Sequence, residues 1–143
     1  MGILGLGSEG VDVVAVDLNL QGQSVVQVCF DASLMLRTSG DYELRIETEV
    51  LLQLSVGDQV SFDPESPGVA AAHLVELARD VIGSAEVRSA GDLVIGFERS
   101  GMTLNVAPND DYESWGLVGP GGKRVTCMPG GEIAVWSDSG IWK

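Results

Sequence analysis

The sequence predicts an α+β domain of about 10 to 12 short, mostly antiparallel strands with one helix. Three observations lead to this prediction. Apolar and polar residues alternate in many short runs, turns rich in Gly and Pro separate these runs, and one segment near the middle has helical spacing instead. A length of 143 residues corresponds to a single domain over 1–143, and 45% hydrophobic with 20% charged residues is typical of a globular chain.

The second half of the chain repeats a pattern of the first. In both copies an apolar run leads into a Ser-Gly turn, at Ser39-Gly40 and at Ser100-Gly101, and alternation then resumes. The paired runs are 34–36 with 44–46 and 95–97 with 104–106, and further β-rich runs precede them at 25–30 and 85–89. We therefore expect two related strand-turn-strand units around one core.

The remaining strands follow from local alternation and turn residues. Residues 1–10 are expected to form a flexible N-terminus, and 138–143 a tail that contains Trp142. Before the helix we expect strands at Val11–Asp17, Val25–Phe30, Leu34–Thr38, Tyr42–Thr48, Leu51–Val56 and Gln59–Phe62. After the helix we expect strands at 84–89, 93–97, 102–107, 115–118, 123–128 and 133–137, with Gly-Gly turns at 121–122 and 130–131.

The helix is predicted over about 67–82, between the two copies of the repeat. Ser66 suits the N-cap, and Pro67 suits the first helical position, where its missing N–H costs nothing. Gly83 suits the left-handed residue after the last turn. The apolar stripe consists of Ala70, Ala71, Leu74, Leu77, Ala78 and Val81.

Charge limits the classes of partner. The net charge of −13 repels nucleic acid and anionic membranes, so we expect neither as a partner, and it attracts basic proteins. No apolar run is long enough to span a membrane and no signal-peptide pattern is present, so we expect a cytoplasmic protein. Cys29 and Cys127 then favour buried, reduced thiols, although a bridge between them stays open at this point.

The sequence favours neither a catalytic site nor a cofactor or metal site. Gly5 to Gly10 match G-x-G-x-x-G, but only four residues precede them and no helix is predicted to follow. His73 is the only histidine, and the two cysteines lack zinc-ligand spacing. No G-x-S-x-G nucleophile motif is present. We therefore expect a protein that is not an enzyme and needs no cofactor.

Three carboxylates form the leading site prediction: Glu43, Glu47 and Glu49. In the strand 42–48, alternation places Glu43 and Glu47 on one face, and Glu49 continues that face if the strand extends to it. The outward residues of the second copy, Thr103, Asn105 and Ala107, are uncharged, so the fold does not require an acidic face. We expect this face to bind a basic protein partner. The alternative is an ordinary solvated face whose charges prevent edge pairing.

Two further functions stay open. Asp110, Asp111, Glu113 and Trp115 form an acidic and aromatic loop that could serve a small-molecule or metal-binding protein, including an enzyme, although Asn and Asp equally favour simple turns. A homodimer that uses an exposed sheet face or the tail around Trp142 is the third interpretation.

The C-terminal third resembles a family of small bacterial proteins of unknown function. The residues that carry the resemblance are Tyr112-Glu113-Ser114-Trp115, the Gly119–Gly122 turn and the run from Val125 to Trp136. The family signature runs Y-E-x-W, a Gly-rich turn, then V-C-x-P-G-G-E-x-x-x-W, and the resemblance extends over roughly residues 20 to 136. It implies no established activity. By size, acidity and fold level, such proteins are similar to immunity proteins that neutralise secreted toxins.

Overall fold

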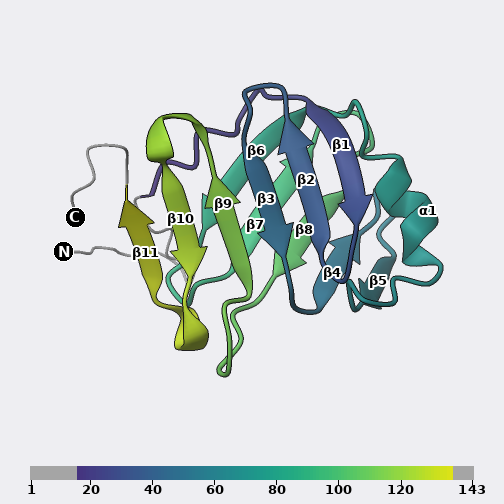
Figure 1. Ribbon diagram of the computed structural model, residues 1–143. Helices are drawn as coiled ribbons and strands as arrows, with labels where there is room; N and C mark the ends of the chain where they lie inside the picture. The colour runs from purple at the N-terminus through teal and green to yellow at the C-terminus, as the bar shows by residue number, and fades with distance from the viewer. Residues whose placement is uncertain (1–15, 137–143) are drawn as a thin grey trace.

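A computed structural model describes residues 16–136, in which eleven strands form two fully antiparallel sheets (Figure 1). The six-stranded sheet has the order β1-β2-β3-β9-β10-β11 and the five-stranded sheet the order β5-β4-β8-β7-β6. The strands are β1 (Val25–Phe30), β2 (Leu34–Thr38), β3 (Glu43–Ile46), β4 (Val50–Gln53), β5 (Gln59–Phe62), β6 (Ile82–Val87), β7 (Leu93–Phe97), β8 (Thr103–Val106), β9 (Trp115–Val118), β10 (Arg124–Cys127) and β11 (Ile133–Trp136).

Several predictions concern residues outside this range. They are the flexible 1–10 segment with its glycine motif, the tail with Trp142, and most of the strand predicted at Val11–Asp17. Residues 16–20, which are described, are not in a strand.

The predicted α+β class is wrong, because the described part of the chain is essentially all-β. Its only α-helix, α1 (Ala70–Val75), has six residues and not the predicted sixteen or so. Val69 replaces Ser66 at the N-cap, and Arg79, with φ of 72°, replaces Gly83 as the left-handed residue. The helix ends early because the chain must join β1: the Arg79 N–H donates to the Val25 carbonyl (2.7 Å), and the Val25 N–H donates to Asp80 (2.8 Å).

The internal repeat is real and longer than predicted. One unit comprises β1 to β5 and the other β6 to β10. Each unit contributes its first three strands to one sheet and its last two to the other, so that β9 pairs with β3 while β4 pairs with β8. Both units also share a register irregularity at the start of the first strand, near Val25 and near Ile82. Each sheet is therefore completed by strands of the other unit.

The structural equivalence differs from the one suggested by the Ser-Gly turns. Leu34 and Leu36 pair with Ile46 and Leu44, as Leu93 and Ile95 pair with Val106 and Leu104. Leu34 thus corresponds to Leu93, not to Ile95. Ser39-Gly40 follows β2 directly, whereas two residues separate the end of β7 from Ser100-Gly101, so aligning the two Ser-Gly pairs shifts the preceding strand by two residues.

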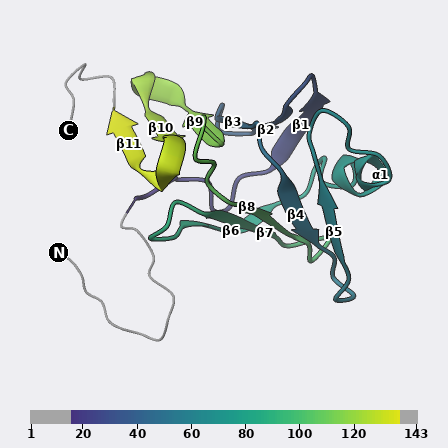
Figure 2. The same ribbon diagram turned by 90° about the horizontal axis from the view of Figure 1, so that it is seen from below.

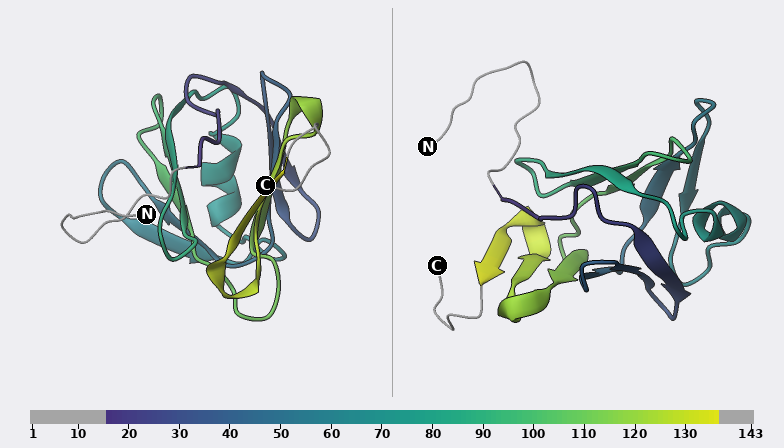
Figure 3. Two further views of the ribbon diagram at one scale, coloured as in Figure 1. Left: turned by 90° about the vertical axis from the view of Figure 1, so that its left-hand side faces the viewer. Right: turned by 90° about the horizontal axis from the view of Figure 1, so that it is seen from above.

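The core lies between the two sheets, which form two layers with α1 at one end (Figure 2). Alternation along each strand directs its apolar residues inward. Helix α1 packs against β5 and buries Ala70 and Leu74. The segment before β1 runs along the rims of the sheets and buries Leu18 and Leu20 (Figure 3). One continuous cluster of buried residues therefore joins all these parts.

The two Gly-Gly turns are confirmed, since all four glycines have positive φ. Gly131 has a second, steric requirement: a Cβ there would lie 2.2 Å from the Ala90 carbonyl oxygen. Gly91 has the same requirement, because its Cβ would lie 2.6 Å from the Gly131 carbonyl oxygen. The β6–β7 turn of one sheet thus packs directly against the β10–β11 turn of the other.

The two cysteines cannot form a bridge in this fold. Cys29 lies on β1 and Cys127 on β10, with three strands between them, and both thiols are free. Four strand spacings amount to roughly 19 Å, well beyond the separation a disulfide allows. Burial raises the pKa of the Cys127 thiol.

Candidate functional site

The candidate site is a hollow on the outer face of the six-stranded sheet. Alternation along β3 buries Leu44 and Ile46 and leaves Glu43 and Arg45 exposed on this face, and Glu47 follows them. The register places Val118 of β9 beside Glu43, and Arg124 of β10 beside Val118. Strands from both units therefore supply the side chains of this face.

Glu49 does not belong to this face, and the expectation that it extends the face is wrong. Strand β3 ends at Ile46, and the chain crosses to the five-stranded sheet, where β4 begins at Val50. Glu49 instead lines a hollow on the outer face of that other sheet, together with Gln53 and Gln59.

We call the hollow on the six-stranded sheet the β9 hollow. It has a volume of about 260 Å³. Its floor is Gly116, at the middle of β9 between Arg45 and Thr126. Among residues 16–136 the lining consists of Glu43, Arg45, Glu47, Glu113, Trp115, Gly116, Leu117, Val118, Arg124, Thr126 and Trp136.

Gly116 creates this hollow without a steric need for glycine. A Cβ at Gly116 would meet nothing closer than 3.8 Å, an ordinary contact distance, and its φ is not positive. The strand glycines Gly83 and Gly96 differ, since Glu98 and Ser84 approach to 2.9 Å of their Cβ positions. A glycine inside a strand weakens it and often marks a close approach of a ligand or another backbone.

The hollow on the outer face of the five-stranded sheet, which we call the β4 hollow, is the counterpart of the β9 hollow on the other sheet. The pairings of β8 with β4 and of β4 with β5 reproduce those of β3 with β9 and of β9 with β10. Leu51 stands where the β9 hollow has Gly116, and Asn105 stands where it has Arg45. At the positions equivalent to Glu43, Glu47, Arg124 and Thr126, the β4 hollow has Thr103, Ala107, Gln59 and Ser61. The Glu43 and Glu47 carboxylates, the two arginines and the open floor are therefore features of one sheet and not requirements of the fold.

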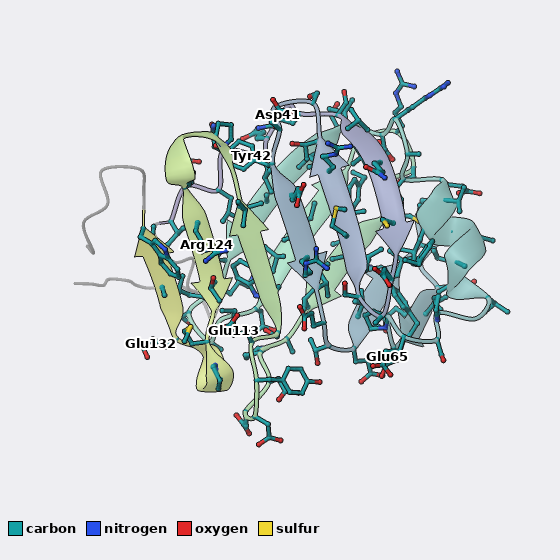
Figure 4. All side chains as sticks on the ribbon, in the orientation of Figure 1. Asp41, Tyr42, Glu65, Glu113, Arg124 and Glu132 are labelled. Atoms are coloured by element: carbon teal, nitrogen blue, oxygen red, sulfur yellow. The ribbon has the colours of Figure 1, made fainter. Side chains whose placement is uncertain are left out.

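The three carboxylates of the β9 hollow have no partner in the part of the chain that the structure describes. Within residues 16–136, the side chains of Glu43, Glu47 and Glu113 form no ion pair and accept no hydrogen bond. The arginines are engaged elsewhere: Arg45 Nη1 donates to Ser33 Oγ (3.1 Å), and the Arg124 guanidinium lies 5.6 Å from the centre of the Trp136 ring. The carboxylates are thus the groups left available to a cation. Figure 4 looks onto this face, with Arg124 on β10 and Glu113 just before β9.

The loop before β9 contributes one carboxylate to this site and not a cluster. Asn109 Oδ1 accepts hydrogen bonds from the backbone N–H of Asp111 (2.7 Å) and Tyr112 (3.3 Å), so Asn109 organises a simple turn. Asp110 and Asp111 are exposed and do not line the hollow, whereas Glu113 does.

The Trp115 side chain lies in the core and not on the open surface of the hollow. The Trp115 indole is buried there, its Nε1–H donates to the Gly91 carbonyl (3.0 Å), and so it does not serve as an open binding surface.

No three His, Cys, Asp or Glu side chains lie together in a metal-binding arrangement among residues 16–136.

Sequence reasoning missed Gly116, Arg124 and Trp136 as residues of one face. Their positions depend on which strands pair across the two units, and no local pattern reports that pairing. The presence of Gly116 within an otherwise alternating strand was the one available signal.

The buried carboxylate of Asp80, which lies outside the β9 hollow, has a structural role. The Asp80 carboxylate, 2% exposed, accepts hydrogen bonds from the N–H groups of Val81 (2.7 Å), Arg99 (2.7 Å) and Ser100 (3.0 Å), and so holds the β7–β8 turn. Burial acts to raise the pKa of Asp80, but these hydrogen bonds outweigh it and lower the pKa below the ordinary value. Gln23 performs the same task in the other unit, where its Oε1 accepts from the Gly40 N–H (3.0 Å).

The fold and this face define a small protein of two packed antiparallel sheets with a charged hollow on one of them. The chain belongs to the family of unknown function DUF6188, whose model matches residues 16–137. Comparisons with curated proteins and with solved structures gave no significant match. None of the helices in residues 16–136 is long and apolar enough to cross a membrane.

Proposed function

We propose that this chain is a cytoplasmic, non-enzymatic binding protein whose β9 hollow receives a basic segment of a partner protein. The observation that carries the proposal is the gathering of three carboxylates, Glu43, Glu47 and Glu113, around an open glycine floor, none of them paired with a described residue. The related β4 hollow has uncharged residues at the positions of Glu43 and Glu47, so the strand arrangement does not depend on these two carboxylates.

Electrostatics and shape have separate parts in the proposed binding. The net charge of −13 accelerates the encounter with a basic partner, and the carboxylates orient the partner on this face. The open space above Gly116 then allows a partner side chain to approach the backbone of β9. Exposed Val118 beside it offers an apolar contact that excludes water.

The composition of the hollow supports binding and not catalysis. Among the described residues, its one hydroxyl side chain, Thr126, is buried and neither histidine nor cysteine lines it, so it lacks a hydroxyl or thiol nucleophile next to a histidine base. The similarity to immunity proteins leads us to expect a secreted toxin as the partner. A homodimer that uses the same face is the competing outcome.

Charge reversal at the hollow tests the proposal. Both variants described here replace three exposed carboxylates by lysine and therefore have the same net charge. The hollow variant carries Glu43→Lys, Glu47→Lys and Glu113→Lys, and the control carries Glu49→Lys, Asp58→Lys and Glu65→Lys. Partners are captured on the wild-type protein, identified by mass spectrometry and titrated by calorimetry against all three proteins.

We expect the hollow variant to bind the captured basic partner at least about tenfold more weakly, because three exposed ion pairs contribute roughly 0.5 kcal/mol each. The control is expected to lose much less, since it alters only the long-range field. Equal losses for the two variants would show that net charge and not this face governs binding. If the wild type instead sediments as a dimer and the hollow variant as a monomer, the result favours self-association through this face.

A further inference from the structure

A second hollow continues the β9 hollow at the end nearest the acidic loop. We call it the Tyr112 hollow, and it has a volume of about 470 Å³. Its lining consists of Glu47, Tyr112, Glu113, Met128 and Pro129. Glu47 and Glu113 also line the β9 hollow, so these two carboxylates stand at the boundary between a charged hollow and a largely apolar one.

The Tyr112 hollow presents apolar surface without a covering element in the described part of the chain. The Tyr112 side chain is 46% exposed, and Pro129 is exposed beside it. The Asn109 turn sets the backbone at Tyr112, since the Tyr112 N–H donates to Asn109 Oδ1. The aromatic ring is therefore attached to an ordered loop. Amphipathic aromatic side chains of this kind often dominate binding energies at protein interfaces.

We infer that the partner binds through a basic side chain placed between Glu47 and Glu113 and an apolar side chain next to it on Tyr112, Met128 and Pro129. This inference rests on the proposed function and specifies its epitope. Charge complementarity identifies the first element, because neither carboxylate has a partner within residues 16–136. In an extended peptide, residues two apart face the same side, so the recognised motif is a basic residue, any residue, then an apolar one.

Amide NMR titration with capped peptides tests this motif. The probe is Ac-Gly-Arg-Gly-Phe-Gly-NH₂. One control peptide replaces Arg by Gln, and another replaces Phe by Ala. We expect the probe to shift the amides of residues 45–47 and 112–117. Replacing Arg is expected to weaken binding about fivefold, from roughly 1 kcal/mol for one cation shared by two carboxylates.

The same titrations are repeated with a protein variant that lacks both carboxylates. The double variant Glu47→Gln, Glu113→Gln should bind the Arg peptide more weakly than the wild type does and bind the Gln peptide equally well. A nonspecific effect on folding would weaken the binding of both peptides. Equal affinity for the Arg and Gln peptides, shifts centred on the β4 hollow, or no shift with any peptide would overturn the inference.

Failure here is distinguishable from failure of the proposed function. With the captured partner in hand, Tyr112→Ala is compared with Val69→Ala, an exposed apolar residue before α1. We expect only Tyr112→Ala to weaken the complex. A partner that depends on the hollow carboxylates but tolerates Tyr112→Ala would leave the proposed function intact and refute the epitope.

Discussion

The Asp80 carboxylate offers the sharpest test of how the two units are held together. It lies at the start of the second unit and accepts three backbone N–H groups, two of them from the β7–β8 turn. The substitution Asp80→Asn keeps the shape of the side chain. It removes the charge and replaces one acceptor oxygen by an NH₂ group that cannot accept from the N–H it would face.

The expected loss follows from these contacts. A hydrogen bond to a charged group contributes about 1.5–3 kcal/mol, and leaving a buried donor unsatisfied costs about 1–3 kcal/mol. Desolvation of the carboxylate, 2% exposed in the native protein, opposes part of this gain. We therefore expect Asp80→Asn to lower the free energy of unfolding by about 2–4 kcal/mol, equivalent to a melting temperature lower by roughly 6–12 °C for a domain of this size.

The pH dependence gives an independent check. The pKa of Asp80 is lowered in the folded protein, so its ionisation stabilises the fold above the unfolded-state pKa, near 3.9. This contribution is lost as the pH falls through the folded-state pKa. The difference between wild type and Asp80→Asn should be largest above about pH 5 and shrink in more acidic solution.

The assay is urea unfolding, followed by circular dichroism between pH 3 and 7, of the wild type, Asp80→Asn and the exposed control Asp58→Asn. We expect the control to stay within about 0.5 kcal/mol of the wild type. An Asp80→Asn variant as stable as the wild type at pH 7, or a stability difference that does not change with pH, would refute this account of the β7–β8 turn.

Three further predictions concern the turns, the hollow and the thiols. Gly130→Ala should lower the free energy of unfolding, measured in urea, by about 1–2 kcal/mol because of its positive φ alone. Gly131→Ala should lower it clearly more, because backbone atoms already occupy the space of its Cβ. Equal losses for the two variants would count against the contact between the sheets. Gly116→Ala should leave the free energy of unfolding unchanged or raise it by about 0.5–1 kcal/mol, and it should lower the affinity for the captured partner. A large loss of stability would contradict the open floor at Gly116. In native protein a thiol reagent should modify Cys29 alone, and Cys127 only after unfolding, as counted by mass spectrometry; fast modification of both would show that the core around Cys127 opens readily.

Local patterns predicted much of the molecule. Each of the eleven described strands overlaps its predicted position, although β4 ends at Gln53 and not at Val56, because alternation with period two is a property of a few consecutive residues. The same alternation correctly placed Leu44 and Ile46 inside and Glu43 outside. The local pattern does not predict the start of β6 at Ile82, because Val81 and Gly83 also fit the end of a helix.

The sequence by itself therefore determined the strands, their inward faces and the existence of two related units. The tertiary structure decided the rest. It shortened the helix, separated Glu49 from Glu43, and brought Glu113 and Gly116 next to Glu47. The physical reason is that these outcomes depend on pairing between distant strands, above all β3 with β9. Such pairing reflects the free energy of closing a whole core, and no stretch of neighbouring residues encodes it.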